Sequence, residues 1–247
     1  ISDSGDLTIT GAATFITTAD DRSIILDRPG NAFTSTVTLK AGNGSNATFD
    51  NITFVDSAGV NLHSIASSAG DLFIDASTDL AVSGSLSITA TTGNITQGSE
   101  LAVGTTSTFT TSASNATITL NDADNTFTGA VALNTDGSSG NATIKNDTAL
   151  LLAASTVDGT LTATATAGNI TQNGALDIEG VTTLVTTAEG ATIDLAANGT
   201  GNAFTGQLLI TTNDNDIPAD TTYAAHVTID GGTTNLIIGN STIDGNL

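Results

Sequence analysis

The chain has 247 residues and a formal net charge of −21, from 25 Asp and Glu against four Lys and Arg. Four cations cannot form a patch that neutralises phosphates, so the composition excludes nucleic-acid binding. No aliphatic run approaches the roughly 20 apolar residues of a transmembrane helix. The lack of cysteine excludes disulfides, thiolate metal sites and cysteine nucleophiles.

The composition favours strands and turns over helices. There are 48 Thr, 22 Asp, 21 Asn and 26 Gly, but three Glu and four Lys and Arg. Thr is stiff at χ1 and favours strands, whereas Asn, Asp and Gly favour turns. Short segments alternate apolar and polar residues, which predicts strands. In chain order, the clearest are Leu7–Ile9, Ile24–Leu26, Val37–Leu39, Ile118–Leu120 and Val131–Leu133.

Three sequence repeats follow one another, at residues 1–94, 95–169 and 170–247. Their apolar positions coincide when they are aligned on Ile1, Ile95 and Ile170. Later in each repeat comes an Asn-x-Phe-Thr element, which starts at Asn31, Asn125 and Asn202. A repeat of short strands buries its apolar face by stacking on its neighbours. The sequence therefore predicts one continuous solenoid over residues 1–247.

The spacing of the strands defines the kind of solenoid. Strands ten to nineteen residues apart leave no room for helical crossovers, so we expect an all-β parallel β-helix. At about 20–25 residues per coil, stacked about 4.8 Å apart, it would have about ten to twelve coils. Buried Asn side chains at the recurring turns could form amide ladders, and Asn94 and Asn169 recur at positions that serve the fold. The alternative is three β-sandwich domains, against which stand the eight Phe, one Tyr and no Trp.

The repeats resemble those of filamentous-haemagglutinin-like bacterial exoproteins and related adhesins. The resemblance rests on Gly-Asn-Ile-Thr-Gln at residues 168–172, the Asn-x-Phe-Thr elements and the segment 149–165. It implies a right-handed parallel β-helix and export to the cell surface, where the chain would be part of a stalk or filament. Host or matrix glycans would be possible partners. Because the chain starts and stops within the repeat pattern, we expect a segment of a longer protein or a subunit that stacks end to end.

Two acidic turns are the candidate metal sites. They offer the hard oxygen ligands that Ca²⁺ requires. The candidate ligands are Asp122, Asp124, Asp214, Asp216 and Asp220. Solvated turns are the simpler interpretation, and no other cofactor is indicated.

Two other activities are weighed against the residues. The acidic pairs could serve acid/base chemistry in a β-helical carbohydrate-active enzyme, but the four cations do not gather near them, so we expect no enzyme. An ice-binding face needs Thr-x-Thr on successive rungs, as at Thr162 and Thr164. Thr36 and Thr38 become Ala130 and Ala132 in the next repeat, which argues against it.

The leading hypothesis is a structural or adhesive segment of an extracellular, cell-surface or matrix protein. The alternatives are a calcium-binding solenoid module that bridges subunits and, least favoured, the carbohydrate-active enzyme. The acidic charge would keep a β-rich chain soluble.

Overall fold

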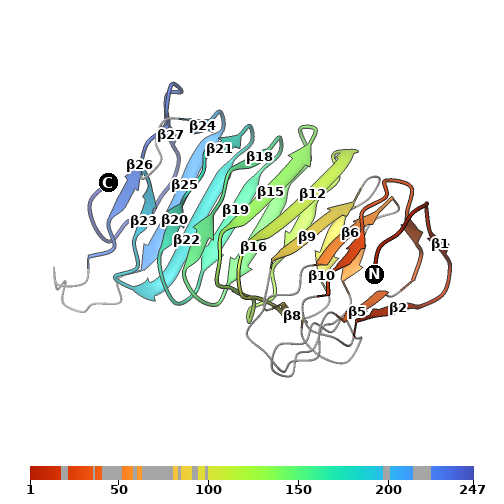
Figure 1. Ribbon diagram of the computed structural model, residues 1–247. Coiled ribbons are helices and arrows are strands. Elements are labelled where there is room, and N and C mark those ends of the chain that lie inside the picture. Colours follow the sequence, from red (N-terminus) through yellow and green to blue (C-terminus); the bar gives the residue numbers. More distant parts are fainter. Residues whose placement is uncertain are drawn as a thin grey trace.

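The chain folds into stacked, parallel β-strands. The computed structural model describes residues 1–17, 22–35, 37–40, 52–57, 60–62, 80–82, 85–90, 94–97, 100–196, 201–213 and 224–247. Within these ranges there are strands and turns but no helix. Every strand pair among them is parallel. The predicted all-β solenoid is therefore confirmed, and Figure 1 shows its strands side by side, with the two termini at opposite ends.

Two large sheets run along the solenoid. The main path of the twelve-stranded sheet contains β3 (Ile24–Leu26), β6 (Ile52–Asp56), β9 (Leu86–Ala90), β12 (Ser107–Ser114), β15 (Val131–Asp136), β17 (Leu150–Leu152), β20 (Ile170–Gln172), β23 (Ile193–Leu195) and β26 (Val227–Ile229). Its side branch contains β18 (Ser155–Val157), β21 (Leu176–Ile178) and β24 (Ala203–Phe204). The eight-stranded sheet contains β7 (Val60–Leu62), β10 (Ile95–Gln97), β13 (Ile118–Leu120), β16 (Ala142–Asn146), β19 (Leu161–Ala165), β22 (Thr182–Glu189), β25 (Gln207–Asn213) and β27 (Ile237–Ile238).

Three small sheets complete the described strands. One contains β8 (Leu80–Val82), β11 (Leu101–Val103) and β14 (Thr126–Phe127). The other two pair β1 (Thr8–Ile9) with β4 (Ala32–Phe33), and β2 (Ala13–Ile16) with β5 (Val37–Lys40).

The strand register gives the length of each coil. One position of the eight-stranded sheet passes through successive partners Ile95, Ile118, Ala142, Leu161, Thr182, Leu208 and Ile238. The predicted ten to twelve coils are not confirmed, because this register traces about six turns. The assumed uniform coil of about 20–25 residues is also wrong. Insertions at the corners stretch the coil from Thr53 to Ser87 far beyond the short coil from Ala142 to Leu161.

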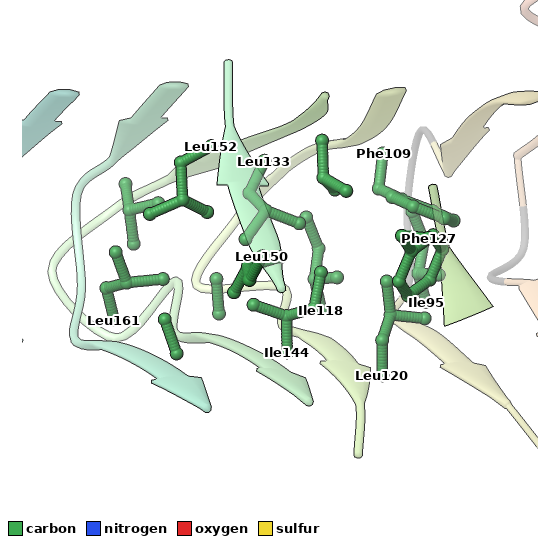
Figure 2. Close-up of a cluster of buried hydrophobic side chains, with 14 of the residues drawn as sticks. Ile95, Phe109, Ile118, Leu120, Phe127, Leu133, Ile144, Leu150, Leu152 and Leu161 are labelled. Carbon is green, nitrogen blue, oxygen red and sulfur yellow. The ribbon is translucent and has the colours of Figure 1, made fainter. Parts of the chain in front are cut away.

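The core is a column of aliphatic and Phe side chains between the two large sheets. Along each strand buried and partly exposed residues alternate, as in β12, β15, β16, β19 and β22. Figure 2 shows Phe109, Leu133 and Leu152 of the twelve-stranded sheet across the interior from Ile118, Ile144 and Leu161 of the eight-stranded sheet. The core is therefore continuous from one coil to the next.

Corresponding strands of consecutive repeats lie on different sheets. The long strands β12 and β22 occupy equivalent positions in repeats 2 and 3 and have the same burial pattern. Yet β12 belongs to the twelve-stranded sheet and β22 to the eight-stranded sheet. The same exchange separates β10 from β20, β13 from β23 and β15 from β25. The repeat of residues 95–169 thus spans about three and a half turns.

A buried Thr closes the corner after each long strand. Its hydroxyl donates a hydrogen bond to the backbone carbonyl five residues further on. The pairs are Thr17 with Arg22, Thr111 with Ala116, Thr135 with Gly140, and Thr186 with Ala191. Between the two partners of the last three pairs lies a residue with positive φ, namely Asn115, Gly137 or Gly190, which lets the chain reverse in few residues.

Candidate functional surface

The conserved Asn of each Asn-x-Phe-Thr element is fully enclosed by the coils around it. Asn31, Asn125 and Asn202 are at most 2% exposed. The Asn202 Oδ1 accepts the N–H of Leu176 at 2.9 Å, and its amide exchanges two hydrogen bonds with the Gln172 amide, each of 3.0 Å. Its Nδ2 also donates to the carbonyls of Leu195 and Asp230. One side chain therefore joins three coils.

The same amide pair recurs one repeat earlier, between Asn125 and Gln97. The Gln97 Nε2 donates to Asn125 Oδ1 at 2.7 Å, and the Asn125 Nδ2 donates to Gln97 Oε1 at 2.9 Å. The predicted burial of recurring Asn is confirmed, but the partner is a Gln rather than another Asn. The signal in the sequence was the fixed distance from Ile-Thr-Gln to Asn-x-Phe-Thr.

Repeat 1 has Asp3 where repeats 2 and 3 have Gln. The Asn31 Nδ2 donates to Asp3 Oδ2 at 2.7 Å, while Oδ1 of Asp3 is buried without a partner. Partial desolvation is the largest effect and raises the pKa of Asp3. Hydrogen bonds from Asn31 and from backbone N–H groups outweigh it together and lower the pKa below its ordinary value.

The acidic turn at Asp122 and Asp124 is closed on itself. One oxygen of Asp122 accepts the backbone N–H of Asp124 at 3.0 Å, which is an Asx-type turn. Among the residues that the structure covers, no three His, Cys, Asp or Glu side chains gather as a metal site would require. Asp214, Asp216 and Asp220 lie outside the described residues. Calcium binding at these turns stays a prediction.

Exposed Asn side chains satisfy the backbone at the corners. The Oδ1 of Asn94, Asn141 and Asn169 each accepts a backbone N–H from the next coil, from Thr117, Thr160 and Thr192 respectively, at 2.8 Å. This geometry agrees with the expected role of Asn94 and Asn169 in the fold. At another corner the exposed His226 accepts the N–H of Asn246 through Nδ1.

A column of threonines runs along the outer face of the eight-stranded sheet. Five successive rungs place Thr in register: Thr96, Thr119, Thr143, Thr162 and Thr183. The sixth rung has Leu209. These side chains are partly exposed and alternate with the buried core residues of the same strands.

The sequence comparison missed this column because it compared residues one repeat apart. Neighbouring rungs are one coil apart, which is 19–26 residues along this column. Residues one repeat apart lie on opposite sheets, as do β15 and β25. The change from Thr to Ala between repeats therefore says nothing about successive rungs.

The two large sheets differ in charge. Between residues 94 and 213 the chain has ten acidic residues and one basic residue, Lys145. The strands of the eight-stranded sheet in this range contain Lys145 and Glu189, whose charges cancel. The strands of the twelve-stranded sheet contain Asp136, Asp177 and Asp194. The remaining acidic residues of this range lie outside the strands.

These features define a parallel β-solenoid repeat protein with a neutral face and an acidic face. The chain belongs to the family described as repeats of unknown function (DUF5649), whose model matches residues 1–40, 61–134 and 139–211. No curated protein and no solved structure matches the chain. No helix in the described part of the chain is long and apolar enough to span a membrane.

Proposed function

We propose that this chain is a structural or adhesive segment of an exported bacterial surface or matrix protein, in which it forms part of a stalk or filament. The observation that carries the proposal is the unbroken strand register across the start of repeat 3. There β19 of repeat 2 pairs with β22 of repeat 3 over five residues. Such a register lets coils be added along one axis without a linker, as a stalk requires.

The side chains support the same role. The interior is a single aliphatic column, and the amide pairs and Thr hydrogen bonds tie each coil to its own corner or to the next coil. The outside is Thr, Asn and Asp, which keeps a long β-rich surface hydrated. Export and adhesion rest on the resemblance of the repeats to filamentous-haemagglutinin-like exoproteins. Self-association end to end and contacts with glycans belong to the same proposal.

Imaging of the native protein tests the stalk, and surface proteolysis tests export. We expect rods or fibres in negative-stain micrographs of the source cells or their matrix, labelled by antibodies to residues 95–247. Protease added to intact cells should remove the epitope, while a cytoplasmic control protein stays intact. Compact particles, or an epitope that is protected until lysis, would contradict the proposal.

A further inference from the structure

The outer face of the eight-stranded sheet has no partner and differs from the rest of the surface. We propose that it is an interface between two copies of this chain, which pack their eight-stranded sheets face to face. This interface, called the threonine face, is defined by the outward residues of β10, β13, β16, β19, β22 and β25. At its centre are Thr143, Lys145, Thr162, Thr164, Thr183 and Val185.

Flatness and regularity fit this face to a second sheet. The rungs follow one another at about 4.8 Å and outward residues along a strand are about 6.6 Å apart. Methyl groups of Thr and Val stand beside hydroxyls over most of the area, so a facing sheet can bury methyls while the hydroxyls pair across the interface. Packed sheets lie about 10 Å apart, which side chains of this size can fill.

Charge decides why the partner is a second copy and which face it uses. A chain of net charge −21 repels its own copies. On the twelve-stranded sheet Asp177 pairs in register with Thr156 and Ala203, and Asp194 with Thr171 and Thr228, so carboxylates stand among its strand residues. On the threonine face the strand charges cancel. Two copies therefore meet the least repulsion when these faces meet.

The area predicts a weak contact. Six rungs by four outward positions cover about 24 Å by about 20 Å, or roughly 1,000 Å² counted on both copies. This is the lower limit for a specific interface, so the isolated chain should dimerise reversibly, with a dissociation constant in the upper micromolar range or above. The contact needs neither export nor adhesion, and a monomeric chain would leave the stalk proposal standing.

Sedimentation velocity over a concentration series tests the dimer. We expect the average mass to rise towards a dimer with concentration. The rise should be steeper when ionic strength increases from about 0.01 M to about 0.15 M, because the screening length falls from about 30 Å to about 8 Å. T162E places a carboxylate at the centre of the face and should weaken association at least tenfold. T171E adds the same charge to a partly exposed Thr on the twelve-stranded sheet and should have no such effect.

A second readout covers a variant that fails to fold. The chain lacks cysteine, so T143C and T171C each give one thiol for a short bis-maleimide. Cross-linked dimers should form with T143C and not with T171C. The proposal is overturned by a chain that stays monomeric at every concentration and salt, or by equal cross-linking of the two variants. It is equally overturned by a monomer that adsorbs to ice or crystalline polysaccharide through T162E-sensitive contacts.

Discussion

At the scale of single residues, polar groups inside the solenoid hold the coils in register. Asn202 receives or donates every hydrogen bond that its amide can make, to three different coils. A buried amide in a complete network stabilises the fold, whereas its removal leaves several partners unsatisfied. The amide pair is thus the clearest single-residue contribution to the register.

N202A is expected to lower the free energy of unfolding by about 2–4 kcal/mol, because the N–H of Leu176, the Gln172 amide and two carbonyls lose a buried partner. Urea denaturation followed by circular dichroism measures the loss. The control is N169A, which removes one exposed hydrogen bond, to Thr192, and should cost about 0.5–1 kcal/mol. Equal losses in the two variants would argue against a special role for the amide pair.

Ser107 presents the opposite case. Its hydroxyl is buried without a hydrogen-bond partner, as is that of Thr182 at the equivalent position of repeat 3. Repeat 1 has Ala13 there. We expect S107A to raise the free energy of unfolding by roughly 0.5–1 kcal/mol, since it removes an unsatisfied polar group with little loss of volume. A lower melting temperature for S107A would show that the hydroxyl has a partner in solution.

Asp3 links stability to pH. Its pKa is lower in the folded chain than the ordinary value of 3.8. It therefore adds stability above the ordinary pKa, and that stability is lost as the pH falls through the folded pKa. D3Q should restore the amide pair seen at Gln97 and Gln172. The expected result is that the difference in melting temperature between D3Q and the natural chain grows in favour of D3Q on going from pH 7 to pH 3. A constant difference would contradict the assignment.

At the scale of elements, each long strand ends at a corner that its own Thr closes. In β22 the hydroxyl of Thr186 is 0% exposed and donates to the carbonyl of Ala191 at 3.1 Å. The residue between them with positive φ is Gly190 in this corner and Asn115 in the corner of repeat 2. The strand length and the corner are therefore specified together.

T186V keeps the shape of the side chain but removes the donor, so it should cost about 1–2 kcal/mol. T183V in the same strand changes an outward Thr and should stay within about 0.5 kcal/mol of the natural chain. Chemical denaturation of both variants makes the comparison within one element. If T183V is as destabilising as T186V, the corner hydrogen bond is not the cause.

How much the sequence predicts depends on the distance over which a residue acts. Alternation of apolar residues identified strands such as Ile118–Leu120 and Val131–Leu133, because burial on one face is a local property. The partner of Asn202 was missed, although it lies 30 residues away in a recurring motif. The threonine column was missed for a related reason: its neighbours are fixed by the varying length of each coil, which the alignment of repeats does not contain.

At the scale of the whole molecule, the repeat is the unit by which the solenoid lengthens. Residues 95–169 span about three and a half turns, with a rise of about 4.8 Å each. A second copy of residues 95–169 inserted after Asn169 should extend the particle by about 17 Å. Small-angle scattering measures the extension, and the melting temperature should not fall, because each added coil brings its own core contacts. A particle that grows in width rather than length would contradict the stacked arrangement.

The half-turn offset of the repeats gives the molecule a parity. When a chain of this kind gains or loses one repeat, everything beyond that point turns its back, and a patch that faced one neighbour faces away from it. A change by two repeats leaves the orientation as it was. Recombination between such repeats would therefore be tolerated most easily in even steps wherever a particular side must be presented, and a census of repeat numbers among relatives with matching surfaces should show that preference.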